Sequence, residues 1–218
     1  AQTAERQADL DEARSAAAAS PEDVGAWLRL AMAAAAAGET NTELAALEQA
    51  EQLTKGDSAI RAMRAEAMSR AADGQVTIPA RELIADILTE DPSEPRALFL
   101  SGLAAYQDEN FGAAVEIWLR LQSLSAPDAP WMALLADNIA DAAQAGGINL
   151  DAVTAARGPD AKTMAAAAEM SDEDRAAMIE GMVEGLAARL AEEPGDAAGW
   201  QRLARAYEVL GRPEDAIR

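Results

Sequence analysis

The sequence predicts an all-α fold made of antiparallel helix pairs that repeat along the chain. Half of the 218 residues are apolar, more than half of these are alanine, and only 4% of all residues are aromatic. Alanine is the strongest helix former and a poor strand former, so this composition favours helices over sheets. Because an alanine side chain buries little surface, a stable core needs many closely packed helices, which an array of repeated helix pairs provides.

A pattern that recurs near both ends of the chain identifies the repeat. Residues 21–31 and 194–204 share the order Pro, Trp, Leu and Ala at identical spacing, and each segment is followed at the same distance by a glycine, Gly38 or Gly211. The second copy also carries Tyr207. These residue types at these intervals are typical of the tetratricopeptide repeat, a helix–turn–helix unit of about 34 residues. We therefore expect a tetratricopeptide-repeat superhelix with a capping helix and a C-terminal helical extension.

The best-formed repeat lies at residues 96–127, and its pattern predicts a first helix over 95–107, a turn at 108–110 and a second helix over 111–123. The small residues Gly102 and Ala114 should let the two backbones approach, while Trp118 should fill the gap between neighbouring units. In the preceding repeat, the turn between the helices is about three residues longer than usual, an insertion that such turns tolerate.

The chain is expected to divide into four parts. The glycine pair at 146–147 should end the first helical block. On the later linker helix, Met178 and Met182 fall on an apolar face, which predicts that both are core residues. The parts are a leading helix at 1–20, three repeats plus a capping helix at 21–145, a linker at 146–170, and a linker helix with a truncated fourth repeat at 171–218.

Charge and residue types exclude several classes of function. The formal net charge is −20, with 38 acidic and 18 basic residues, which argues against nucleic acid and anionic membrane surfaces as partners. The acidic residues either attract a basic protein segment or keep an alanine-rich surface soluble. Cysteine and histidine are both absent, so thiol nucleophiles, Cys/His zinc sites and Ser-His-Asp triads are excluded. We expect no cofactor, no metal and no enzymatic activity.

The predicted repeats offer one surface for binding. In such arrays the first helices of the pairs line a concave groove, and a mixture of apolar and hydrogen-bonding side chains there suits an amphipathic helix or an extended peptide. The alternative is that the apolar members only pack against neighbouring helices. Trp131, at the start of the capping helix, receives no firm assignment. The residues expected to face the groove are Leu28, Met32, Glu66, Arg70, Arg96, Phe99, Leu103, Tyr106 and Gln107.

Six stretches of the chain form a further pattern, namely 96–106, 113–118, 127–131, 170–182, 186–190 and 199–211. Together they resemble the CcmI family, also called CycH, of cytochrome c-type biogenesis proteins. The resemblance implies the periplasmic domain of a membrane-anchored bacterial protein, with the transmembrane helices in a missing N-terminal part. A chain that starts at Ala1 without an initiator methionine and stops at Arg218 in mid-pattern fits this expectation of a soluble fragment.

The resemblance also implies a non-catalytic chaperone. Such a protein would hold apocytochrome c by its C-terminal helix for the haem-ligation complex, and other proteins of cytochrome c maturation would be further partners. Contact with the membrane is expected only through the missing anchor. The main alternative is a bacterial envelope scaffold that binds folded partner proteins, and an enzyme is the third class. A scaffold should bind folded surfaces and ignore free helical peptides.

Overall fold

The computed structural model describes residues 2–157, 170–192 and 194–212. Within these ranges the chain forms eleven helices and no strand, which confirms the all-α prediction. The chain divides into two compact units, Ala1–Ile148 and Asn149–Arg218. The helices are α1 (Gln2–Ala19), α2 (Val24–Ala37), α3 (Thr40–Thr54), α4 (Ser58–Ala71), α5 (Ile78–Glu90), α6 (Pro95–Gln107), α7 (Phe111–Leu124), α8 (Met132–Gly146), α9 (Leu150–Arg157), α11 (Asp172–Glu192) and α12 (Ala197–Val209).

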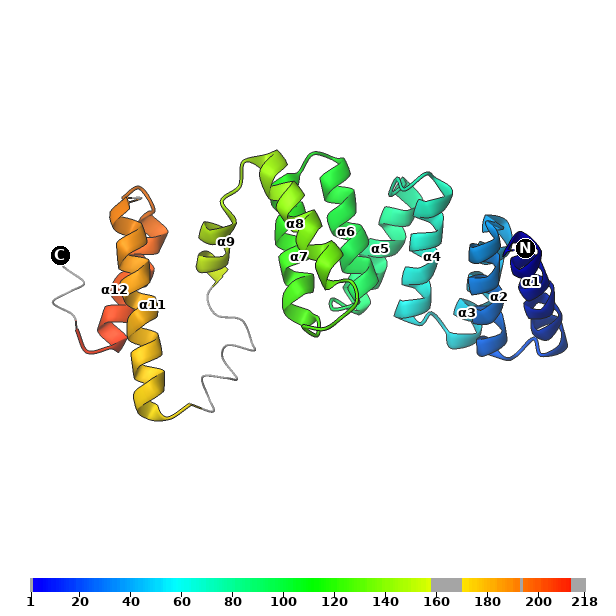
Figure 1. The fold of residues 1–218 in the computed structure, drawn as a ribbon, viewed down its shortest axis with the longest axis horizontal. Coiled ribbons are helices and arrows are strands. Elements are labelled where there is room, and N and C mark those ends of the chain that lie inside the picture. The colour runs from blue at the N-terminus through cyan, green and yellow to red at the C-terminus, as the bar shows by residue number, and fades with distance from the viewer. Residues whose placement is uncertain (1, 158–169, 193, 213–218) are drawn as a thin grey trace. The chain divides into compact units, whose positions relative to one another are not determined.

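The first unit is a stack of helix pairs in which each helix packs against the next one along the chain. Figure 1 shows α1 to α8 running alternately up and down. The repeats are the pairs α2/α3, α4/α5 and α6/α7, with α1 before them and α8 after them. The first helices of the second and third repeats, α4 and α6, also contact each other, so these two helices share a face. This is the arrangement of a tetratricopeptide-repeat superhelix, in which the first helices line the concave side.

The third repeat has the helix bounds that its sequence predicts. α6 spans Pro95–Gln107 and α7 spans Phe111–Leu124, which is one residue longer than expected. Pro95 occupies the first helical turn of α6, where the missing backbone N–H has no intrahelical partner to lose. The side chain of Asn110 caps α7 by accepting a hydrogen bond from the Ala113 amide at 3.3 Å. Local signals therefore determine where both helices begin.

The turn of the second repeat is long and is tied to the third repeat. α4 ends at Ala71 and α5 begins at Ile78, which confirms the predicted insertion. Gln107, the last residue of α6, holds the turn through both ends of its side-chain amide. Its Oε1 accepts from the Val76 amide at 2.9 Å, and its Nε2 donates to the Gly74 carbonyl at 2.8 Å. One side chain thus satisfies two backbone groups of an irregular segment.

Trp118 packs against Gly102 inside the third repeat. Trp118 is 1% exposed, and its indole N–H donates to the Phe99 carbonyl at 3.0 Å. The centroid of its ring lies 6.2 Å from that of Phe99 and 6.1 Å from that of Tyr106. These contacts are all with α6, the other helix of the same pair. The sequence placed Trp118 between units, whereas in the structure it fills the space inside the pair, where Gly102 leaves room for the ring.

In the second unit, α11 packs against α12 around a core of Val183, Leu190 and Leu203. The apolar face of α11 is therefore present as predicted. Met178 is partly buried, but Met182 is 42% exposed, so the prediction that Met182 is a core residue is wrong. The face that meets α12 is centred on Val183, one position further along the helix, which turns the side chain of Met182 toward the surface.

The pattern shared by the first and fourth repeats has the same local structure in both units. Trp27 donates its indole N–H to the Pro21 carbonyl at 2.8 Å, and Trp200 donates to the Pro194 carbonyl at 3.2 Å. Each tryptophan thereby fastens the helix to the loop that precedes it. The recurrence supports a structural role for both residues.

The predicted linker at 146–170 is described only in part. Its first half contains α9, whereas residues 158–169 lie outside the described residues, as do residues 213–218 of the predicted fourth repeat. The four-part division of the chain stays a prediction.

Candidate binding site

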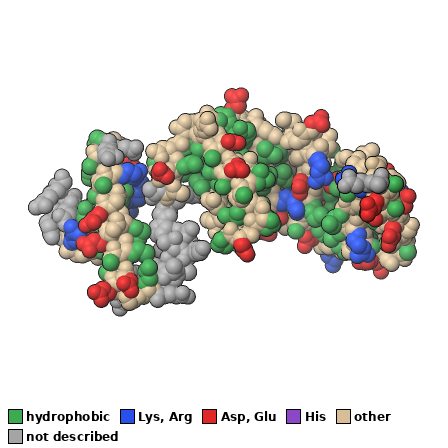
Figure 2. All heavy atoms as spheres, in the orientation of Figure 1, with side chains coloured by type: hydrophobic (Ala, Val, Ile, Leu, Met, Phe, Trp, Pro, Cys, Tyr) green, Lys and Arg blue, Asp and Glu red, His purple; other side chains and the backbone are tan. Residues whose placement is uncertain are grey.

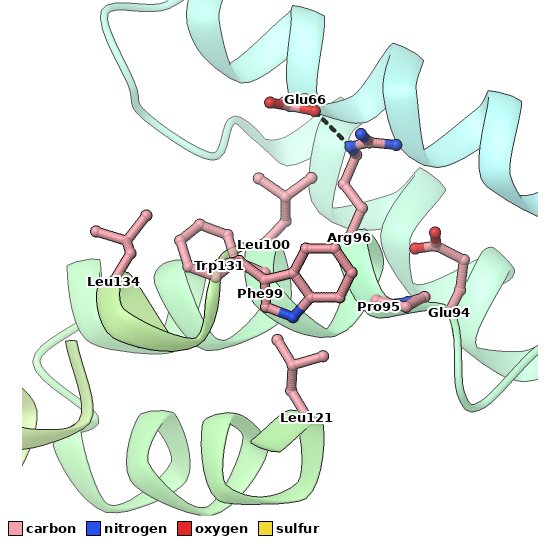
Figure 3. A pocket seen from close by; sticks show the side chains of 9 residues that line it. All are labelled: Glu66, Glu94, Pro95, Arg96, Phe99, Leu100, Leu121, Trp131 and Leu134. Atoms are coloured by element: carbon pink, nitrogen blue, oxygen red, sulfur yellow. Dashed lines mark ion pairs between the residues drawn. The ribbon is translucent and has the colours of Figure 1, made fainter. Parts of the chain in front are cut away.

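A pocket opens in the first unit where the start of α6 meets α4, α7 and α8. Its volume is about 340 Å³, and Figure 3 shows the side chains around it. Because α4 and α6 are the first helices of their pairs, the pocket lies on the side that forms the groove in this architecture. The lining residues are Glu66, Glu94, Pro95, Arg96, Phe99, Leu100, Leu121, Trp131 and Leu134.

Apolar side chains form most of the pocket. Leu100 and Leu121 are 3% and 1% exposed and belong to the buried core beneath it. Trp131 and Leu134, near the start of α8, are 40% and 56% exposed and stand at the mouth. The indole N–H of Trp131 donates to Ser125 Oγ at 3.2 Å, so the polar edge of the ring is satisfied while the ring lines the pocket. Large exposed apolar side chains beside a buried floor are typical of a protein-binding pocket.

A series of ion pairs runs across the repeats and ends at the pocket. Arg96 Nε lies 2.5 Å from Glu66 Oε2, the pair that Figure 3 marks with a dashed line. Glu66 also lies 3.7 Å from Arg70, whose Nη1 donates to the two carboxylate oxygens of Glu43 at 2.7 and 2.9 Å. Glu43 is buried, and its hydrogen bond is the main cause that raises the pKa of Arg70. The series joins α3, α4 and α6.

Glu94 adds a buried carboxylate to the edge of the pocket. It is 6% exposed and caps α6, accepting a hydrogen bond from the Ala97 amide at 2.5 Å. Burial raises the pKa of Glu94 above its usual range, and the helix-capping bond opposes this shift without cancelling it. Figure 3 places Glu94 and Pro95 at one side of the pocket and Leu134 at the other.

The structure brings together three of the nine residues that the sequence assigns to the groove. Glu66, Arg96 and Phe99 all line the pocket. Met32 is 65% exposed on α2, away from this pocket, and Leu28 packs against the core of the first repeat. A binding role for these residues stays a prediction.

The other four predicted residues have partners within the fold. Leu103 packs against the core of the second and third repeats, and the ring of Tyr106 lies edge-on to Phe111 with 5.4 Å between centroids. Arg70 holds the buried Glu43, and Gln107 holds the turn before α5. A substitution at any of these residues would therefore lower the stability of the fold, and this effect has to be measured before weaker binding is attributed to a lost ligand contact.

Sequence reasoning missed Trp131 and Leu134. They lie three residues apart at the start of α8, after a loop that contains two prolines. That spacing places them on one side of a helix, which was the available signal. The loop before α8 determines which face of that helix lies toward the groove. The spacing of apolar residues carries no information about the course of this loop.

Comparison with known proteins identifies the family. Residues 13–132, more than half of the chain, match the family model described as "Cytochrome c-type biogenesis protein H TPR domain". The chain belongs to the CycH family of cytochrome c-type biogenesis proteins. The match includes every lining residue of the pocket except Leu134, so the pocket belongs almost entirely to the CycH family domain.

Two curated relatives, each named cytochrome c-type biogenesis protein CycH, extend the similarity. The protein of Rhizobium meliloti is 35% identical over 92% of this chain and 53% of its own length. The protein of Bradyrhizobium diazoefficiens is 35% identical over 77% of this chain and 47% of its own length. The chain thus spans about half the length of the CycH relatives that it matches.

The fold also resembles a solved structure of another repeat protein. A chain in the crystal structure of the APC/C hetero-tetramer Cut9-Hcn1 superposes with a TM-score of 0.57 and 16% sequence identity, covering 98% of this chain and 35% of that chain. At this identity the likeness concerns the fold alone.

The described residues offer little for other kinds of site. Across 2–157, 170–192 and 194–212, no group of three or more acidic side chains is placed to hold a metal ion. In the same part of the chain, no helix combines the length and apolarity that crossing a membrane requires.

Proposed function

We propose that this chain takes part in cytochrome c maturation by holding the C-terminal helix of apocytochrome c for the haem-ligation complex. In this proposal it is a non-catalytic chaperone domain on the periplasmic side of a bacterial inner membrane, and other proteins of the maturation machinery are further partners. Support comes from membership of the CycH family and from the names of the two relatives. A tetratricopeptide-repeat fold is typically used for protein interaction rather than for catalysis.

The observation that carries the proposal is the apolar pocket on the side of α4 and α6, bordered by the Glu66–Arg96 ion pair. An amphipathic helix presents one apolar stripe flanked by polar residues. Laid along this surface, such a helix would place its stripe against Phe99, Trp131 and Leu134 and its polar flanks beside the ion pairs. A folded cytochrome would keep the same stripe inside its own core.

The net charge of −20 supports a basic helix as the ligand. Long-range attraction between an acidic surface and a basic peptide raises the association rate, and salt screens this attraction over about 8–10 Å. The proposal therefore includes a measurable salt dependence.

Calorimetric titration tests the proposal. The 218-residue chain is titrated with synthetic peptides of apocytochrome c C-terminal helices and, separately, with folded haem-loaded cytochrome, each at low and high salt. We expect the peptides to bind and the folded protein to bind much more weakly. Binding of the folded cytochrome but not of the peptides would favour the alternative of an envelope scaffold for folded partners. An absence of binding by every peptide would refute the function proposed for this chain.

A further inference from the structure

We propose that the pocket at the start of α6 is an anchor subsite that takes one large apolar side chain of the bound helix. A lysine or arginine one turn away on that helix pairs with the carboxylates at the edge of the pocket, Glu66 and Glu94. This inference rests on the proposed function in that it assumes a helical ligand. It adds the chemistry that the ligand needs: an aromatic or leucine anchor and a cation three or four residues from it.

The pocket has room for a large side chain but not for a whole helix. Its volume of about 340 Å³ lies near the lower end of the roughly 300–1,000 Å³ range of small-molecule sites. A whole helix is about 10–12 Å in diameter and is too wide to enter such a space. A single large side chain can enter while the helix backbone stays above the mouth. This is the arrangement in which a few buried anchors supply most of the binding energy of an interface.

The surroundings of the pocket favour an apolar anchor. Its floor is made by core residues, Leu100 and Leu121, which cannot move away without opening the third repeat. Its mouth is made by Trp131 and Leu134, which remain 40% and 56% exposed. Figure 2 shows hydrophobic side chains over α7 and α8 on the face that it draws. Covering the exposed parts of Trp131 and Leu134 removes apolar area from water and favours binding.

The charges at the edge favour a cation on the ligand. Two carboxylates, Glu66 and Glu94, and one guanidinium, Arg96, line the pocket, so the lining carries one excess negative charge. The excess persists when the ion-pair series is followed outward, because Arg70 is matched by Glu43. A basic side chain would therefore meet complementary charge, and an acidic one would meet repulsion. The net charge of the chain, −20, acts in the same direction.

A host peptide series tests the two requirements separately from cytochrome sequences. The probes are fluorescently labelled alanine-based helical peptides: one with a tryptophan anchor and a lysine four residues later, one with alanine in place of the anchor, and one with glutamate in place of the lysine. Anisotropy titrations use the full chain and the variants Leu134→Ala and Glu66→Gln. The matched control is Ile78→Ala, which removes an equally large side chain that is 72% exposed on α5 and is not part of the pocket.

We expect Leu134→Ala to weaken binding of the anchored peptide about tenfold, the effect of about 1.4 kcal/mol, and Ile78→Ala to leave it unchanged. Glu66→Gln should weaken the lysine peptide and not the glutamate peptide. The alanine peptide, which keeps the lysine, should bind the full chain more weakly than the anchored peptide does, and Leu134→Ala should not weaken it further. Because Leu134 is more than half exposed, its truncation should leave the fold intact, which circular dichroism verifies.

Equal affinity of the anchored and alanine peptides, or equal losses in Leu134→Ala and Ile78→Ala, would overturn the anchor subsite. A concentration-dependent dimer that Leu134→Ala abolishes would overturn it too, since a second copy would then be the occupant. The two proposals fail separately. If cytochrome peptides bind the full chain and Leu134→Ala equally well, the subsite is refuted and the function stands. If only the host peptides bind, the function is refuted while the ligand chemistry of the pocket stands.

Discussion

The close approach of Trp118 to Gly102 predicts that Gly102→Ala destabilises the third repeat. A Cβ added at Gly102 would lie 2.2 Å from Trp118 Nε1 and 2.5 Å from its Cδ1, distances that no relaxed structure keeps. The Trp118 ring must therefore move, although it is almost fully buried and donates a hydrogen bond to Phe99. Overpacking of this kind costs about 1–3 kcal/mol, and weakening a buried hydrogen bond adds about 1 kcal/mol.

Helix propensity acts in the opposite direction. Replacing a helical glycine by alanine gains about 1 kcal/mol, so the net destabilisation expected for Gly102→Ala is about 1–3 kcal/mol. The matched control is Gly112→Ala on α7, where an added Cβ has no neighbour within 4 Å and only the propensity gain applies. Urea unfolding followed by circular dichroism should therefore show opposite shifts for the two variants.

A second substitution tests the cause. The atoms of Trp118 nearest to the added Cβ are Nε1, Cδ1 and Cε2 of the indole, and an alanine at this position has none of them. Trp118→Ala should therefore cost less stability in the Gly102→Ala background than in the native one, with a coupling of about 1 kcal/mol or more. The reasoning is refuted if Gly102→Ala is as stable as the native chain, or if the two substitutions are simply additive.

Three further predictions concern polar groups. Burial raises the pKa of Glu94 in the folded chain above its value in the unfolded chain. Between these two pKa values the unfolded chain binds fewer protons at Glu94 than the folded chain does. The free energy of unfolding therefore falls as pH rises through this window. Glu94→Gln keeps a cap acceptor, and its melting temperature relative to native should rise between pH 4 and 7; a pH-independent difference would contradict this. Gln107→Ala should speed hydrogen exchange at the Val76 amide, because it removes the acceptor of that amide. Unchanged exchange there would show that the Gln107 side chain does not protect the turn. Arg70→Ala leaves Glu43 buried without its partner and should cost about 1–3 kcal/mol in urea unfolding, and Glu43→Gln in the same background should recover part of this loss if the pairing is the cause.

The course of the third repeat could be predicted almost residue by residue, because its determinants are local. Pro95 begins α6, Asn110 caps α7, and the spacing of apolar residues gives each helix its buried face. The long turn before α5 was equally visible, since counting residues between matched positions needs no knowledge of packing. The family resemblance drawn from the sequence was likewise confirmed by comparison with known proteins.

The pocket could be predicted only in part, because its members come from segments that are distant in sequence. Glu66 and Arg96 were assigned to one surface from helix periodicity, but their ion pair depends on how α4 packs against α6. Trp131 and Leu134 follow the loop after α7 and line the pocket together with residues of α6, and the course of that loop is not visible in helical spacing. The partners of Gln107 and Arg70 lie 31 and 27 residues away, beyond what helical spacing can report. Such pairings belong to the tertiary structure.

The amide of Gln107 has a consequence for how the chain can be divided. The turn between α4 and α5 belongs by sequence to the second repeat, but two of its backbone groups are satisfied by a residue at the end of the third. A fragment cut after α5 would keep every residue of the second repeat and still expose the Val76 and Gly74 backbone groups. The second repeat is therefore complete only when the third is attached, and these repeats cannot be exchanged as independent modules.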